Sequence, residues 1–373
     1  MTATVHERPA PRRPAAPPGR LLTPGRSFQG AALRGAAVAA RLASALAIAA
    51  ALVGCAASNG STPAAAASSS GAATVLSPAA PLPPPAASTS PSVAFPPLPP
   101  AAIDADFLLL GELHDNVAQH RLRLHWLETL ADLHPFALAL EQFDADRQEA
   151  LDRARAEDTR EAANPSTAPD LASRARRIAQ AAGFAFDGWE WDLYRPAIEL
   201  ALRRGLPLVA ANLSPADTTL VAKGSVPPAP PPPGWGVGET EAMRASIRQG
   251  HCGLLPERAV DAMAVAQRTR DDRIARALVD ARERTGLPVV LLAGNGHLRR
   301  DIGVPLHLAA MRPQARIVSI ALLEGPGAED EGVAEAERPP FDLTVHTDAQ
   351  PREDPCAALR ERMRPRARSS DSR

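Results

Sequence analysis

Two short apolar runs, far apart in the chain, each end in glycine and then present a histidine. Phe107–Leu110 is followed by Gly-Glu-Leu-His-Asp, and Pro288–Ala293 is followed by Gly-Asn-Gly-His. Continuous apolar runs of this length are typical of strands that are buried on both faces of a sheet. Open α/β sheets bind ligands at the carboxyl ends of their strands. The pair therefore predicts both a class of fold and the place of a site within it.

Further apolar runs predict more strands of the same kind, and amphipathic patterns lie between them. We expect strands also at Phe136–Glu141, Pro207–Ala211 and Ile317–Leu322, with a weaker pattern at Phe341–His346. Helical patterns cover Val117–Leu133, Pro196–Arg204 and Glu257–Glu283. The second begins with a proline, which suits the first turn of a helix. This alternation predicts an α/β fold with a mainly parallel sheet, covered by helices on both faces, and a small helical subdomain. Two segments are expected outside this scheme, a loop at Asp158–Asp170 and a proline-rich extended insertion at Gly224–Gly238.

Polar side chains recur where the predicted strands end. Glu112 and His114 follow the first strand, Glu141 ends the second, Asn212 follows the third, and Asn295 and His297 follow the fourth. If the strands are parallel, all of these side chains meet at one rim of the sheet. That convergence is the main internal evidence for a site.

The N-terminal part of the chain carries the features of an exported lipoprotein. No charged residue occurs between Leu42 and Ile103, and within this stretch Leu42–Val53 is an apolar run that is too short for a stable membrane span. Arg34 and Arg41 precede the run, and it ends in Leu-Val-Gly-Cys, which resembles a bacterial lipobox. We therefore expect a signal peptide over 1–54 and lipid attachment at Cys55. The alternative is a chance alanine-rich run before a buried cysteine.

The composition around the folded part predicts its limits. Residues 55–102 are rich in Ala, Ser and Pro, so we expect a disordered tether that holds the domain 103–358 away from a membrane. An arginine-rich tail, 359–373, is also expected to be disordered. Because Ala56 rather than aspartate follows Cys55, the anchor is expected in the outer membrane, facing the periplasm. The net charge of −1 gives no support for nucleic-acid binding.

Several motifs, in order along the chain, resemble those of ChaN-like haem-binding lipoproteins, a branch of the Tiki and erythromycin-esterase superfamily. The resemblance covers most of residues 107–358. It rests on the following segments: Gly111-Glu-Leu-His-Asp-Asn116 with His120, Glu141, Trp191 with Tyr194, Gln267-x-x-Arg-Asp271, Gly294-Asn-Gly-His297 with Ile302-Gly-Val-Pro305, and Asp354-Pro-Cys356. The lipobox fits the same family.

The resemblance implies a membrane-tethered protein of haem or iron handling that binds haem between two copies of itself. In the family a tyrosine holds the haem iron, and basic side chains of the partner subunit hold the propionates. Tyr194 is the only tyrosine of this chain, and Lys223 is its only lysine. The implied iron ligand is therefore Tyr194, and the implied partners of the propionates are Arg or His side chains or Lys223. The full set of candidate cofactor-binding residues is Tyr194, Glu112, His114, His120, Glu141, Asn295 and His297.

Other interpretations of the same residues stay open. Glu112, His114, Glu141 and His297 are suitable ligands for a divalent metal ion, so a metal-dependent hydrolase of the Tiki-like kind is the alternative function. The histidines could also be rim residues without a ligand, and the two glutamates could simply pair with arginines such as Arg270. No Gly-x-Ser-x-Gly segment occurs in the chain, which disfavours a serine hydrolase.

Two cysteines remain once Cys55 is assigned to the lipid. In an exported domain such a pair favours a disulfide. Cys252 and Cys356 both lie in loop-like contexts, so we expect a bridge between them. The competing interpretations are two free cysteines, or ligation of haem or metal by Cys252 beside His251.

Overall fold

A computed structural model of the chain describes residues 95–164, 166, 168–325 and 340–363. The predicted signal peptide, the lipidation site Cys55 and most of the predicted tether and tail lie outside the described residues. Within these ranges, none of the helices has the length and apolar character needed to cross a membrane.

Six strands form one sheet in which every neighbouring pair is parallel. Their order across the sheet is β3-β2-β4-β1-β5-β6. The strands are β1 (Phe107–Leu110), β2 (Ala137–Asp144), β3 (Leu208–Asn212), β4 (Val289–Leu292), β5 (Ile317–Glu324) and β6 (Leu343–Thr347). The two apolar runs that opened the sequence analysis are β1 and β4, and they pair in register from Phe107 with Val289 to Leu110 with Leu292.

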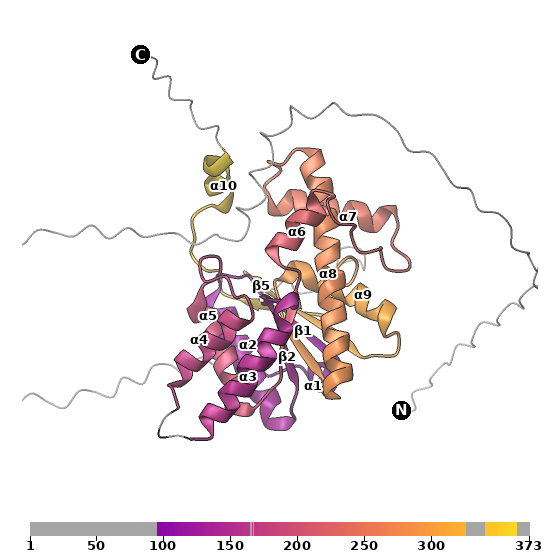
Figure 1. Ribbon diagram of the computed structural model, residues 1–373. Helices are drawn as coiled ribbons and strands as arrows, with labels where there is room; N and C mark the ends of the chain where they lie inside the picture. Colours follow the sequence, from indigo (N-terminus) through magenta and orange to yellow (C-terminus); the bar gives the residue numbers. More distant parts are fainter. Residues whose placement is uncertain (1–94, 165, 167, 326–339, 364–373) are drawn as a thin grey trace, which may run out of the picture. The chain divides into compact units, whose positions relative to one another are not determined.

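Helices cover both faces of the sheet, which confirms the predicted α/β architecture (Figure 1). Alternate strand residues such as Leu108 and Leu140 pack against α2 (Val117–Leu133), α4 (Leu171–Ala181) and α5 (Trp191–Arg204). Residues on the other face of the strands, such as Leu109 and Leu291, pack against α8 (Glu257–Thr285) and α9 (Val304–Met311). The continuous apolar runs arise because each strand faces a helical layer on both sides.

The centre of the sheet contains a topological switch point. β1 continues into α2 on one face, whereas β4 continues through η3 (Asn295–Leu298) into α9 on the other face. The segments that follow these two adjacent strands therefore separate and leave a crevice between them. Crevices of this kind are where doubly wound sheets bind ligands.

A small helical unit extends from one end of α8, in agreement with the predicted subdomain. It contains α6 (Pro215–Ala222) and α7 (Val237–Gly250), and a small apolar cluster of Met243, Ala264 and Ile302 packs α7 against α8 and the segment before α9. Residues 225–236 between these two helices form neither helix nor strand, as predicted for the proline-rich insertion.

The structure pairs Cys252 with Cys356, whose Cα atoms are 5.7 Å apart, as predicted. The bridge joins the end of α7 to α10 (Pro355–Met363). Because both sulfur atoms are used in the bridge, it excludes the alternatives of free thiols and of ligation by Cys252.

Four local predictions differ from the structure. α5 begins at Trp191, so Pro196 lies inside the helix and not in its first turn. The predicted loop at Asp158–Asp170 is helical as far as Ala162, the last residue of α3 (Gln148–Ala162). Asp158 is buried in this helix, where it forms ion pairs with Arg155 and Arg174. α10 reaches into the predicted tail.

The fourth difference concerns the start of the domain. Residues 95–102 were expected in the tether, but Leu98 is buried and the Trp126 indole donates a hydrogen bond to the Pro96 carbonyl. α1 (Pro100–Ile103) follows directly. The folded domain therefore begins before residue 103.

Candidate functional site

Two buried glutamates at the carboxyl ends of β1 and β2, the strands on either side of β4, organise the site. Glu112 follows β1 and is 1% exposed, and Glu141 lies near the end of β2 and is 3% exposed. The register between β2 and β3 shifts directly after Leu140, and irregularities of this kind re-aim side chains beside functional sites. Each glutamate holds a separate set of partners, named below as the Glu112 cluster and the Glu141 cluster.

The Glu112 cluster consists of Glu112, His114, His120, Arg123 and Tyr194. The Tyr194 hydroxyl donates to Glu112 Oε1 at 2.7 Å, and His114 Nδ1 lies 2.8 Å from the same oxygen. The Arg123 guanidinium pairs with Glu112 Oε2. The carboxylate is therefore fixed by donors from α2, from α5 and from its own strand end.

His120 takes part in the Glu112 cluster as a neutral ring. Its Nε2 lies 3.0 Å from the His114 carbonyl, and its Nδ1 lies 2.9 Å from Arg123 NH2. Because Arg123 can only donate, Nδ1 accepts and the proton sits on Nε2. Burial lowers the pKa of His120 to about 4, which agrees with a neutral ring.

His114 is the member of the Glu112 cluster that faces outward. Its Nδ1 donates to Glu112, so Nε2 carries the lone pair, and among the described residues Nε2 makes no hydrogen bond. The ring packs edge-on against Trp189 and close to Gly294, and this withdrawal from water lowers the pKa of His114. Even so, 47% of the side chain remains exposed. The result is a neutral imidazole with one free nitrogen at the rim.

The Glu141 cluster consists of Glu141, Arg270, Asp271, His297 and the Gly294 amide. Glu141 Oε1 accepts from Arg270 at 2.9 Å and lies 3.2 Å from His297 Nε2, whereas Oε2 accepts from the Gly294 amide at 2.8 Å. His297 Nδ1 lies 2.5 Å from Asp271. Arg270 and Asp271 are adjacent residues of α8, so this helix supplies one charge of each sign to the rim.

Charge dominates the Glu141 cluster. Burial opposes a charge on His297, but Glu141 and Asp271 outweigh it and raise the pKa of His297 to about 9. Burial likewise opposes the charge of Glu141, yet His297 and Arg270 hold its pKa well below the usual range. His297 is therefore a cation that donates from both nitrogens and has no lone pair left for a metal or a haem iron.

The glycines of the two motifs are required by close approaches. A Cβ atom at Gly294 would lie 2.8 Å from His114 Cε1, and one at Gly111 would lie 2.0 Å from Asn295 Oδ1. A side chain at either position would displace the neighbouring site residue.

The Asn295 side chain forms hydrogen bonds with the backbone of the sheet. Its Nδ2 donates to the Leu322 carbonyl, and its Oδ1 accepts from the Leu322 amide. These bonds tie η3 to β5 and use both ends of the amide, so the geometry gives Asn295 a positioning role beside the site.

Two cavities lie beside the clusters and share no lining residue. A rim cavity of about 240 Å³ opens at the strand ends, between His114, Glu141, Arg270 and His297 on one side and α7 with His251 on the other. A second cavity of about 180 Å³ lies between α2 and α5 and is lined by His120, Arg123 and Tyr194. His114, Glu141 and His297 therefore line one cavity, and His120 and Tyr194 line the other.

The structure thus brings the residues predicted from the sequence together in two groups and not in one. Glu112, His114, His120 and Tyr194 meet in one cluster, and Glu141 with His297 in the other. Arg123 was not predicted, because nothing in its local sequence marks it except its place beside Leu122 and Trp126 on a buried helix face. The alternative interpretation, in which the glutamates pair with arginines, also applies: Arg123 pairs with Glu112, and Arg270 pairs with Glu141.

The described residues hold no group of three or more His, Cys, Asp or Glu side chains arranged to bind a metal ion. The reason is visible in the two clusters. Both glutamates are saturated by arginine and histidine donors, and His297 is protonated on both nitrogens. The proposed metal ligands Glu112, His114, Glu141 and His297 therefore do not form a metal centre in this arrangement.

The fold and the rim site define an all-parallel α/β domain with a binding crevice at its switch point. The family described as haem-binding uptake, Tiki superfamily, ChaN, matches residues 100–308. Because this match spans more than half of the chain, the chain belongs to the ChaN family.

A solved structure shares the fold of this chain. A structure of cofacial haem binding to ChaN of Campylobacter jejuni is 22% identical, with a TM-score of 0.52, and the match covers 65% of this chain and 87% of that one. A mutant erythromycin esterase in its open conformation is 13% identical, with a TM-score of 0.35, over 60% of this chain and 71% of that one. The second likeness is too distant to bear on fold or function. The comparison with curated proteins found no match.

Proposed function

We propose that this chain is a haem-binding lipoprotein of the cell envelope that serves haem or iron uptake, with haem seated at the rim cavity. The observation that carries the proposal is the free Nε2 of His114 at the mouth of that cavity, in a chain of the ChaN family. Histidine is a common axial ligand of haem iron, and bound haem would supply an iron centre for transport or storage.

The two candidate iron ligands differ in how they fit that role. Tyr194 is 1% exposed, its hydroxyl already donates to Glu112, and burial raises its pKa, which disfavours the phenolate. His114 is neutral, exposed and held in orientation by Glu112. The side chains at the rim therefore fit a haem whose iron is bound by His114. Tyr194 is the iron ligand that the family resemblance implies.

Basic groups for the propionates also line the rim cavity. His251 lies at the end of α7 with its Nδ1 2.7 Å from the Ile247 carbonyl, which leaves Nε2 for a ligand. Arg270 lies on the opposite wall, although Glu141 and Asn212 already accept from it. His251 is thus the better-placed group for an anionic edge.

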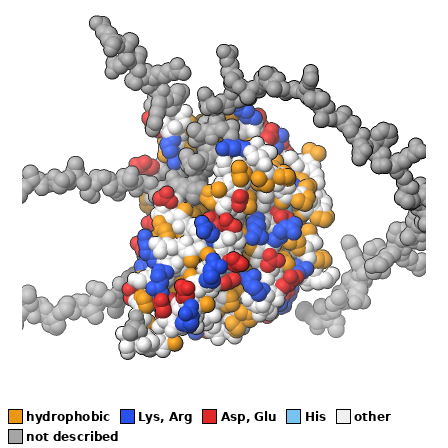
Figure 2. Space-filling model, viewed as in Figure 1, with side chains coloured by type: hydrophobic (Ala, Val, Ile, Leu, Met, Phe, Trp, Pro, Cys, Tyr) orange, Lys and Arg blue, Asp and Glu red, His pale blue; other side chains and the backbone are white. Residues whose placement is uncertain are grey.

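The size of the rim cavity supports a homodimer. A volume of about 240 Å³ is below the ~300 to 1,000 Å³ that pockets for drug-sized ligands span, so one chain cannot enclose a porphyrin. Hydrophobic side chains gather on the face over α7 and the proline-rich segment (Figure 2). Val237 is 88% exposed there, and Leu220 and Val226 are also exposed. A second copy would cover both the haem and this surface.

The test is a titration of the full chain with haemin, followed by absorbance. The change His114→Ala removes the free nitrogen and should weaken haem binding and shift the Soret band. Tyr194→Phe keeps the buried ring and should leave the spectrum unchanged. The reverse pattern would assign the iron to Tyr194, and the absence of binding to the folded parent chain would refute haem binding itself.

Membrane attachment is proposed through a lipid on Cys55, in the outer membrane facing the periplasm. The support is the apolar run that ends in Leu-Val-Gly-Cys. Replacing Cys55→Ser should move the protein out of the membrane fraction and abolish labelling by a lipid precursor. Unchanged fractionation and labelling would contradict the anchor.

The alternative function is hydrolysis, and the orientation of His114 favours one form of it. A neutral imidazole held by a carboxylate, with its free nitrogen facing a cavity, has the geometry of a general base. The test is a metal analysis of the purified chain together with an ester-hydrolysis assay. Turnover that His114→Ala abolishes would favour this function over haem binding without turnover.

A further inference from the structure

Two segments beside the rim cavity are joined through the C-terminal part of the chain. The Arg352 guanidinium donates to both carboxylate oxygens of Asp115, with Nε at 2.8 Å and NH2 at 2.9 Å. A short way further along the chain, Cys356 forms the disulfide bridge to Cys252. Residues 352–356 therefore connect the loop after β1 with the end of α7, and this segment is named the strap below.

Each end of the strap is fixed next to a histidine of the rim cavity. His114 directly precedes Asp115, His251 directly precedes Cys252, and the two histidines line opposite sides of the cavity. Fully extended, the strap spans at most about 14 Å. The Cα atoms of the bridge are 5.7 Å apart. The strap therefore limits how far the α7 wall can move away from His114.

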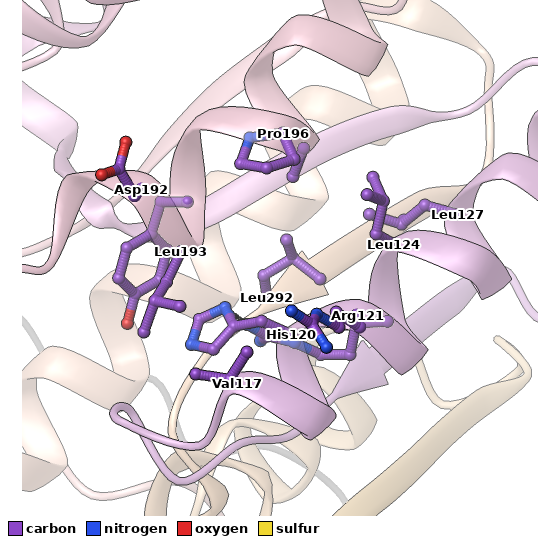
Figure 3. Close-up of a pocket in the computed structure, with 12 residues that line it drawn as sticks. Val117, His120, Arg121, Leu124, Leu127, Asp192, Leu193, Pro196 and Leu292 are labelled. Carbon is purple, nitrogen blue, oxygen red and sulfur yellow. Dashed lines mark hydrogen bonds between the residues drawn. The ribbon is translucent and has the colours of Figure 1, made fainter. Parts of the chain in front are cut away.

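The wall that carries His114 is fixed by the core of the domain. His114 is oriented by Glu112, which also accepts a hydrogen bond from Tyr194 of α5. Arg123 of α2 pairs with the same carboxylate. Figure 3 shows Leu292 of β4 between side chains of these two helices. Because the core is closely packed, this side of the cavity is rigid.

The α7 wall has fewer restraints. Met243 is the only buried residue of α7. Arg244 and Arg248 pair with the exposed Glu257 of α8, and ion pairs at such positions contribute little. Cys252, just after the helix, has a φ of 56°, a left-handed conformation that persists only where the surrounding structure imposes it. The bridge is thus a main restraint on this wall.

The bridge can be reached by a reductant, since neither Cys252 nor Cys356 is buried. A thiolate of a dithiol reductant attacks one sulfur, forms a mixed disulfide with it and releases the other cysteine as a thiolate. The second thiol of the reductant then displaces the first cysteine. Two electrons and two protons pass to the protein, and the reductant leaves as its own disulfide.

We propose that the strap is redox-sensitive: with the bridge closed it holds the α7 wall at the rim cavity, and reduction of the bridge releases this wall. His251 moves with the wall, so a ligand in the cavity loses one of the groups that hold it. The application to haem rests on the proposed function, whereas the release of the wall does not depend on it.

The first test measures the α7 wall without haem. Hydrogen exchange of the full chain is compared before and after treatment with excess dithiothreitol, and alkylation with mass spectrometry identifies Cys252 and Cys356 as free thiols. After reduction, the amides of α7 should exchange at least about tenfold faster, while those of β1 and β4 stay unchanged. Unchanged exchange in α7 would overturn the proposal. Equally faster exchange throughout the sheet would overturn it too, and so would a bridge that resists the dithiol in the folded chain.

A lengthened strap separates the effect of the strap from that of the bridge. Three glycines inserted between Glu353 and Asp354 keep both anchors and add roughly 10 Å of slack. This insertion should loosen α7 as reduction does, although alkylation still finds the bridge intact. The same insertion between Pro169 and Asp170, in the loop before α4, is the matched control and should leave α7 unchanged. An α7 that stays as protected with the lengthened strap as in the parent chain would refute the role of the strap.

The last test concerns the proposed haem site. Cys356→Ser takes the place of reduction here, because a free dithiol would itself react with haem iron. Haemin should leave this variant for an excess of an apo haem protein about tenfold faster than it leaves the parent chain. Equal transfer rates from the parent and from a variant with a loosened α7 would overturn regulation of the site by the strap.

Two controls keep these outcomes apart. Thermal unfolding checks that Cys356→Ser folds, and if it does not, the glycine insertion in the strap gives the same measurement with the bridge intact. A parent chain that binds no haemin would refute the proposed function, and the hydrogen-exchange experiments would still decide whether the strap holds the wall.

Discussion

The Glu112 and Glu141 clusters each place a glutamate at the carboxyl end of a strand on one side of β4, and they stabilise it in different ways. Glu141 is held by two cations, His297 and Arg270, and its own charge keeps His297 protonated. Glu112 is held by one cation, Arg123, and by neutral rings that donate from His114 and Tyr194. Only the second arrangement leaves a neutral histidine with a free nitrogen. The comparison teaches that histidines in two similar glycine-rich motifs can acquire opposite protonation states.

The largest effect is expected from Glu141→Gln, which keeps the shape of the side chain and removes its charge. The buried His297 would keep only Asp271 as an anionic partner, and the partly exposed Arg270 would lose Glu141, at a cost of about 3 kcal/mol in the free energy of unfolding. Urea unfolding measures this loss. Glu149→Gln is a matched control, because the Glu149 side chain is 91% exposed and its pair with Arg153 contributes little. A cost near that of the control would show that the Glu141 cluster is not held by charge.

The second prediction concerns alkaline pH. The pKa of His297 is raised from 6.5 to about 9, so its charge stabilises the fold fully below pH 6.5, and this contribution is lost as the pH rises through 9. The loss is about 3 kcal/mol in total. Urea unfolding of the parent chain and of His297→Gln across this range measures it. Parallel pH dependences of the two proteins would contradict the assignment of a charged His297.

The third prediction concerns acid pH, and its sign is opposite. The pKa of His120 is lowered from 6.5 to about 4, so neutral His120 stabilises the fold above pH 6.5, and this contribution is lost as the pH falls through 4. The expected loss is again about 3 kcal/mol. His120→Gln should flatten this part of the stability curve. If the variant and the parent lose stability equally between pH 6.5 and 4, the two clusters do not differ as described.

Much of the fold was predictable because its signals are local. Each strand except β6 begins as a largely apolar run, and all six predicted strands occur. The start of α5 was missed because residues 191–195 become helical by packing Tyr194 and Trp191 onto the core, while Pro196 suggested a boundary. The helical Asp158 was missed for a similar reason, since its arginine partners include Arg174 on the next helix.

The position of the site was predictable from the sequence, but the division of its residues into the Glu112 cluster and the Glu141 cluster was not. Convergence of Glu112, His114, Glu141 and His297 follows from parallel strands alone. Strand order, which places β4 between β1 and β2, decides which side chains meet, and no single sequence reveals it. The roles of Arg123 and Asn295 depend on contacts across that order, with Glu112 and with the backbone of Leu322.

The smallest effect is expected from Tyr194→Phe, which tests whether neutral donors stabilise Glu112 less than cations stabilise Glu141. The variant keeps the ring against His120 and Phe184 and removes only the hydroxyl that donates to Glu112. Because the carboxylate keeps Arg123 and His114, the loss should be about 1.5 kcal/mol, near the lower limit for a hydrogen bond to a charged group. Urea unfolding at pH 7 measures it beside Glu141→Gln. A loss equal to that of Glu141→Gln would show that the Tyr194 hydroxyl is as necessary to its cluster as the charge of Glu141 is to the other, and the distinction between the two clusters would then fail.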